Sequence, residues 1–195
     1  MTLPSQSTGT PAIGNSRAAT LVAEDNMGTA LIDLGRDDEA ITHFRNAIRV
    51  KPTEPKAHLV LGALLLKHGD AQQAIEQCKI ALSMTSDPDD LLAIYTNLGV
   101  AYRQSGDYSA AGDSFRQLLQ RDPSNTAAMG ALGRVMLLQS AERQAHEVDL
   151  HPTADGFSQL ASLWQQAGDI ERAKAAYQSG LALRAKKLLP ANPRR

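Results

Sequence analysis

Apolar residues recur three or four positions apart along most of the chain, in short segments that glycine or proline separates. The clearest case lies between residues 92 and 125, where each of two segments carries one apolar face. The positions that form these faces are Tyr95, Leu98, Tyr102, Ala111, Phe115 and Leu118. Gly106 can adopt the left-handed conformation that ends a helix, and Asp107 can cap the helix that follows. This stretch predicts two short helices joined by a tight turn.

The same unit recurs along the chain. A small residue of the first helix returns at spacings of 34, 37, 34 and 28 residues, at Gly28, Gly62, Gly99, Gly133 and Ala161. Seven residues after four of these stands a second glycine, at Gly35, Gly69, Gly106 and Gly168. Sixteen residues after four of them stands a larger apolar residue, at Phe44, Cys78, Phe115 and Tyr177. Small residues let two helices approach closely and large ones fill the adjoining gaps, so these columns predict an array of helix pairs.

A repeat of helix, turn and helix with a period of 34 residues resembles the tetratricopeptide repeat (TPR), whose Leu-Gly, Tyr or Leu, Ala, Phe and Pro columns are matched here. The resemblance covers about residues 21–187. It implies an all-α fold, an α-solenoid of antiparallel helix pairs that winds as a right-handed superhelix of about five units. The expected units are about 21–54, 55–88, 92–125, a degenerate 126–153, and 154–187.

The array as a whole is expected at 16–189, after a flexible segment at 1–15 and before a basic tail at 190–195. Three extra residues around Asp89 and Asp90 are expected to lengthen the connection before the third unit. The fourth unit departs most from the pattern, because residues 140–152 keep neither the Gly-Asp turn nor the Ala and Phe columns. We expect its second helix to be short or irregular and this unit to be the weakest joint of the array.

Composition narrows the function. A net charge of −1 argues against a nucleic-acid partner. Cys78 is the only cysteine, which fits a reducing compartment. The first fifteen residues lack the charged and apolar parts of a secretory signal. The longest apolar run, at 59–66, is far shorter than the roughly eighteen residues a membrane span needs. We therefore expect a cytoplasmic protein with no direct membrane insertion.

In proteins that this chain resembles, the first helix of each pair lines a concave groove that binds peptides. The groove-facing candidates are Asn26, Thr29, Leu59, Val60, Ala63, Leu66, Ala93, Asn97, Val100, Arg103, Arg134 and Leu137. The apolar members are more numerous than packing within one repeat requires, and a contiguous exposed apolar patch usually marks an interaction site. The alternative is that some of them are core between neighbouring first helices.

Grooves of this kind hold a peptide by two known kinds of polar contact. Asn26 and Asn97 resemble the asparagine ladder of O-linked N-acetylglucosamine transferase, in which amides hold the backbone of an extended peptide. The ladder is incomplete, and the alternative is an ordinary helix-surface asparagine. A chaperone-type carboxylate clamp needs lysines and an arginine. The matching positions supply no cation, since they are Asp25, Thr29, Val60, Ala93 and Asn97.

Residues suited to catalysis or metal binding are few. His146, Glu147, Asp149 and His151 fit no known short motif, and a solvated loop is the favoured interpretation. His58 and Cys78 occupy positions where the repeat has packing residues, so both are expected in the core. The sequence therefore predicts no metal, no cofactor and no enzymatic activity.

These observations predict a non-catalytic scaffold that binds an extended or helical segment of another protein. One alternative is the TPR module of a larger glycosyltransferase or membrane-associated enzyme assembly. The other is a homo-oligomer, in which the chain associates with itself as a structural unit.

Overall fold

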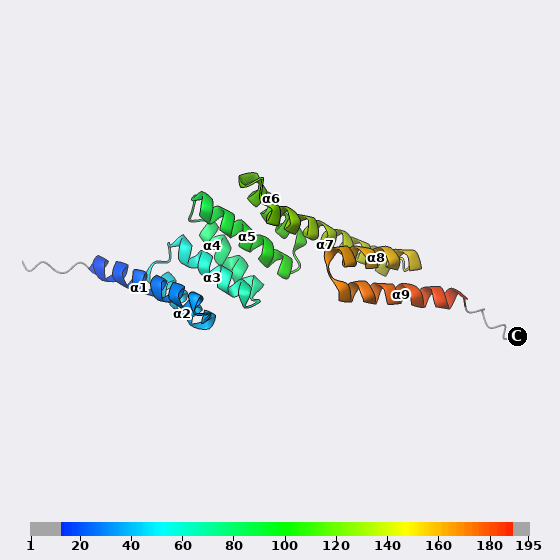
Figure 1. Ribbon diagram of the computed structural model, residues 1–195, viewed down its shortest axis with the longest axis horizontal. Helices are drawn as coiled ribbons and strands as arrows, with labels where there is room; N and C mark the ends of the chain where they lie inside the picture. The colour runs from blue at the N-terminus through cyan, green and yellow to red at the C-terminus, as the bar shows by residue number, and fades with distance from the viewer. Residues whose placement is uncertain (1–12, 189–195) are drawn as a thin grey trace, which may run out of the picture. The chain divides into compact units, whose positions relative to one another are not determined.

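The computed structural model describes residues 13–188, with side chains from 16 to 187, and within this range the chain is helical and contains no strand (Figure 1). The expected flexible segment therefore lies largely outside the described residues, and the expected basic tail at 190–195 lies wholly outside them. The helices are α1 (Ile13–Asp33), α2 (Asp37–Val50), α3 (Pro55–Lys67), α4 (Ala71–Leu82), α5 (Pro88–Gln104), α6 (Tyr108–Arg121), α7 (Thr126–Leu150), α8 (Ala154–Ala167) and α9 (Ile170–Leu188).

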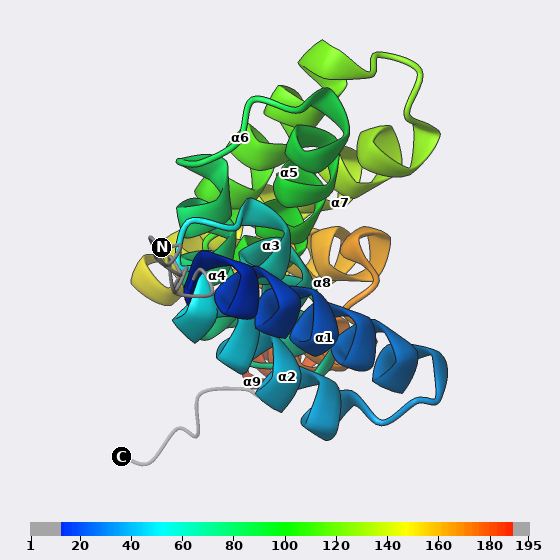
Figure 2. The same cartoon turned by 90° about the vertical axis from the view of Figure 1, so that its left-hand side faces the viewer.

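The chain divides into two compact units, Met1–Asn97 and Leu98–Arg195. In the first unit α1 packs on α2, α2 on α3, and α3 on α4. Figure 2 views this unit end-on, with α1 in front of α2. In the second unit α6 packs on α7, α7 on α8, and α8 on α9. The all-α prediction and the solenoid of antiparallel helix pairs are confirmed.

The turns form as the sequence predicts. Gly35, Gly69, Gly106 and Gly168 all have positive φ, between 72° and 88°. Asp107 caps α6, because its carboxylate accepts a hydrogen bond of 3.0 Å from the backbone N–H of Ala110. Asp70 does the same for α4, at 3.1 Å from the N–H of Gln73. Left-handed glycine followed by a capping aspartate is thus what ends one helix and starts the next.

Small residues of the first helices allow close packing within a pair. A Cβ atom placed on Gly99 would lie 2.6 Å from the ring of Phe115, and one on Gly28 would lie 2.8 Å from the ring of Phe44. In the second repeat Cys78 takes the place of the ring, and its Sγ atom would lie 2.8 Å from a Cβ atom on Gly62. These distances are too short for a side chain, so packing requires glycine at Gly28, Gly62 and Gly99.

The fourth unit is not a helix pair, and the prediction of a short or irregular second helix is wrong. Residues 126–150 form the single continuous helix α7 of 25 residues. The cause is local: the segment from Ser140 to Leu150 contains neither glycine nor proline and is rich in Ala, Glu, Arg and Gln, which favour helix. Without a glycine to reverse the chain, the first helix runs on through the place of the turn.

The third unit begins earlier than expected. Asp89 and Asp90 do not lengthen a connection; they lie in the first turn of α5, which begins at Pro88. Proline suits the first position of a helix, and carboxylates favour its positive end. The Asp87 side chain accepts hydrogen bonds from the N–H groups of Asp89 and Asp90, at 3.0 and 3.1 Å. The extra residues therefore extend the helix.

Candidate functional site

Most candidates in the first compact unit, Met1–Asn97, lie on the accessible side of the first helix of each pair. On α1 the side chains of Asn26 and Thr29 are exposed. On α3 Ala63 is exposed, while Leu59 and Val60 are half-buried. The first unit therefore presents a strip of partly exposed apolar groups on α3 and polar groups on α1.

Three other candidates of this unit differ from one another. Ala93 on α5 is exposed. Leu66 is only 9% exposed and belongs to the core, so it contributes little surface to a ligand. Asn97 is half-buried, and its side-chain amide hydrogen-bonds the thiol of Cys78. Asn97 is thus already engaged within the protein, unlike the exposed Asn26.

The two residues expected to serve packing are buried. Cys78 is fully buried, and this burial raises the pKa of its thiol to about 12, against the smaller opposing effect of Asn97. A thiol held protonated in this way is a poor nucleophile. His58 is 4% exposed, and its ring nitrogens lie 2.8 Å from Oε1 of Gln77 and 3.0 Å from the carbonyl oxygen of Pro52. His58 is therefore a core residue that also ties α3 to its neighbours.

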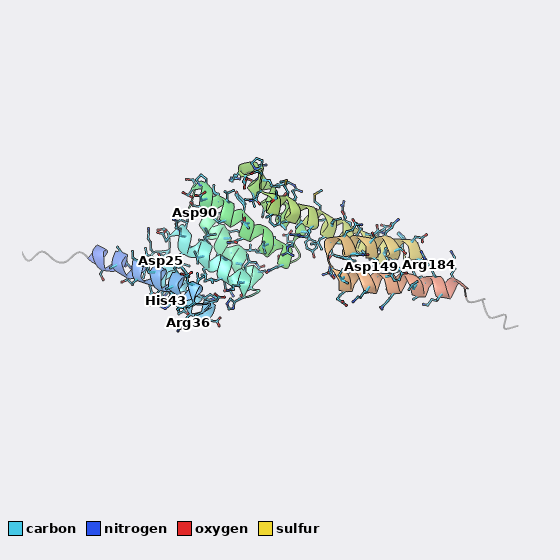
Figure 3. All side chains as sticks on the ribbon, viewed as in Figure 1. Asp25, Arg36, His43, Asp90, Asp149 and Arg184 are labelled. Atoms are coloured by element: carbon cyan, nitrogen blue, oxygen red, sulfur yellow. The ribbon has the colours of Figure 1, made fainter. Side chains whose placement is uncertain are left out.

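Asp25, beside Asn26 on α1, has an unusual environment. Burial raises the pKa of its carboxyl, and the nearby carboxylates of Glu54 and Glu24 raise it further, while Lys51 lowers it. Within the described residues, its buried Oδ1 has no hydrogen-bond partner. Figure 3 shows Asp25 on α1 and His43 on α2. His43 binds Glu24 at 2.7 Å, whereas Oδ1 of Asp25 lacks a donor among the described residues, as does the buried Oδ1 of Asp37.

The candidates in the second compact unit, Leu98–Arg195, and Val100 among them, lie on α5 and α7. Arg103 and Arg134 are exposed, and Val100 and Leu137 are half-buried. His146, Glu147 and Asp149 lie on the last turns of α7 rather than in a loop, and His151 follows its end. Among the described residues, no three side chains of His, Cys, Asp or Glu gather as a metal site would require.

The chain matches two models of one family: a TPR repeat model over residues 28–69 and a tetratricopeptide repeat model over residues 54–124. Its relatives include the BBSome complex member BBS4 of Bos taurus, 32% identical over 111 residues that cover 57% of this chain and 21% of that protein. Another is the photosystem I assembly protein Ycf3 of Prochlorococcus marinus, 26% identical over 100 residues that cover 51% of this chain and 57% of that protein. The chain thus spans about a fifth of the length of BBS4 and just over half of the length of Ycf3.

Solved structures agree on the fold. The first TPR of Spaghetti (RPAP3), bound to an HSP90 peptide, has a TM-score of 0.58 at 16% identity and covers 63% of this chain and 94% of that one. MamA of Desulfovibrio magneticus has a TM-score of 0.56 at 19% identity and covers 87% of this chain and 97% of that one. The columns, the helix pairs and these matches agree: the chain belongs to the tetratricopeptide repeat proteins, whose fold supports a protein-interaction scaffold.

Within the described residues, no helix combines the length and the apolar character needed to cross a membrane.

Proposed function

We propose that this protein is a non-catalytic scaffold whose first unit binds an extended or helical segment of another protein on the side formed by α1 and α3. The observation that carries the proposal is the strip of Leu59, Val60 and Ala63 on α3, which is only partly covered, together with exposed Asn26 on α1. Apolar side chains left accessible beside polar ones are typical of peptide-binding surfaces.

Asp25 gives this surface a preference for ligands with a positive charge. A cation on the ligand beside this carboxyl group would relieve the repulsion from Glu54 and Glu24. A carboxylate stands here where a chaperone-type clamp has a cation. The segment bound should therefore carry a lysine or arginine beside an apolar side chain, and it should not be held by a terminal carboxylate.

The test is selection of random displayed peptides on the immobilised protein, followed by fluorescence anisotropy with the peptides recovered. Ala63→Glu should weaken binding by roughly tenfold or more, because it places a charge in the apolar strip. Gln72→Glu on α4 adds the same charge at an exposed site outside the surface and should leave binding unchanged. Asp25→Asn should weaken only peptides that contain Lys or Arg. If the recovered peptides bind Ala63→Glu and Gln72→Glu with the affinity that they have for the wild type, the site lies elsewhere.

A further inference from the structure

The two end helices of the described chain each expose an apolar face. On α1 this amino-terminal face consists of Ala23, Met27 and Ala30, and Leu34 continues it in the turn that follows the helix. On α9 the carboxy-terminal face consists of Ile170, Tyr177 and Leu181, with the charged Lys174 between them. Met27 is 52% exposed and Leu34 69%, while Tyr177 is 56% exposed and Leu181 46%. Exposed apolar faces of this kind are candidates for an interface.

Inside the chain, the equivalent positions are buried against each other. The counterparts of Ala23, Met27 and Ala30, thirty-four positions later, are Ala57, Leu61 and Leu64 on α3, which are 1%, 3% and 4% exposed. The counterparts of Tyr177 and Leu181 are Phe44 and Ile48 on α2. Helix α2 packs on α3, and Ile48 and Leu61 line the same cavity there. Ile48 and Leu61 therefore show one contact between the two kinds of face, whereas the ring of Phe44 packs on Gly28 of α1 within its own helix pair.

Charge complements shape at the two ends. Helix α1 carries three carboxylates, Glu24, Asp25 and Asp33, against the single cation Arg17. Helix α9 carries five cations against the single carboxylate Glu171. Arg172, Lys174 and Arg184 also form ion pairs within the chain, and the other two cations are Lys186 and Lys187. Opposite charges on two surfaces steer them together and penalise contact between like ends.

We propose that the amino-terminal face of one copy docks on the carboxy-terminal face of a second copy, so that α9 and α1 reproduce between molecules the contact that α2 and α3 make within the chain. The partner is thus another copy of this protein, and the interface is heterologous, since two different surfaces meet. Such a contact continues the repeat array from one molecule into the next and leaves the α1–α3 surface of each copy accessible to its own ligand.

Single charged substitutions separate this arrangement from any symmetric one. Met27→Glu removes the amino-terminal face and leaves the other intact, whereas Tyr177→Glu does the reverse. Each variant alone should be a monomer of 20.9 kDa. An equimolar mixture should form a heterodimer of twice that mass and nothing larger, because one functional face remains on each partner. A matched control is Val22→Glu on α1, an exposed position about 100° or more around the helix from the amino-terminal face.

The measurement is sedimentation velocity on the full chain from about 1 μM to about 1 mM, the range of moderate to weak affinities. The wild type and the Val22→Glu control should gain mass with concentration, and each face variant should lose this association by roughly tenfold or more. Circular dichroism checks that all variants keep the same helicity. The proposal fails if the wild type stays monomeric throughout, if the mixture of face variants does not associate, or if only Met27→Glu is defective, which would indicate a symmetric contact between two α1 helices.

Discussion

The glycine column allows a matched pair of substitutions that isolates one packing contact. Gly99 and Gly133 occupy the same column of the repeat on first helices, α5 and α7. A Cβ atom on Gly99 would lie 2.6, 2.6 and 2.9 Å from three ring carbons of Phe115. A Cβ atom on Gly133 would meet nothing within 4 Å among the described residues, because the fourth unit has no second helix to cover it.

The expected magnitudes follow from two terms. Replacing glycine by alanine within a helix stabilises by about 1 kcal/mol, and this gain applies to both sites. Overpacking costs roughly 1–3 kcal/mol, and three contacts this short against a ring that is 2% exposed indicate the upper end. Gly133→Ala should therefore stabilise by about 1 kcal/mol and Gly99→Ala should destabilise by about 2 kcal/mol. The difference of about 3 kcal/mol is the steric term alone.

The assay is urea unfolding followed by circular dichroism at low protein concentration, with thermal unfolding as a second measure. In a chain of this length the two variants should differ in Tm by roughly 6–12 °C. Similar stabilisation by both substitutions would refute the reasoning, since it would mean that the ring of Phe115 moves aside at no cost. Equal destabilisation by both would refute it in the other direction, by showing that α7 is covered at Gly133.

Three further predictions concern single contacts, each measured by urea unfolding. The pKa of Cys78 is raised by burial from 9.0 to about 12, so the stability that the buried neutral thiol contributes is complete below pH 9 and is lost as the pH rises from 9 to about 12. The difference between wild type and Cys78→Ala should shrink over that interval, and a difference independent of pH would contradict it. Asp70→Ala should cost about 1 kcal/mol through loss of the α4 cap, while an unchanged midpoint would show that solvent replaces the cap. His58→Phe should destabilise by about 1–3 kcal/mol, because it leaves Gln77 and the carbonyl of Pro52 without their partner. The family pattern, which favours an aromatic residue there, predicts a neutral change instead.

The regular part of the fold could be predicted because each local signal agrees with its neighbours. Gly106 and Asp107 mark a turn, and the distance from Gly99 to Phe115 along the sequence sets the two helices face to face. Where two signals competed, prediction failed. The residues around Asp89 and Asp90 were expected to lengthen a connection, although proline followed by aspartate, as at Pro88, is also a good helix start.

The candidate site was predicted less well than the fold. Helical periodicity identifies which residues share a face, but it does not distinguish a half-buried side chain such as Leu59 from a core side chain such as Leu66. The hydrogen bond between Asn97 and Cys78 joins residues nineteen positions apart, and no local pattern indicates it. The environment of Asp25 depends on Glu54 in the same way. These properties arise from packing between helices, which periodicity does not report.

The continuous helix α7 also affects how the second compact unit, Leu98–Arg195, folds. In a regular array each turn lets one helix pair melt while its neighbour stays folded. Helix α7 spans about 37 Å without a turn, packs on α6 along its first half through Val135, and holds Ala141 and Val148 buried in its second half, where α8 lies. Melting one half would break a helix in its middle and expose new ends, which is unfavourable. The helices from α6 to α9 are thereby coupled into one cooperative folding block, in a family whose stability is otherwise divided among its repeats.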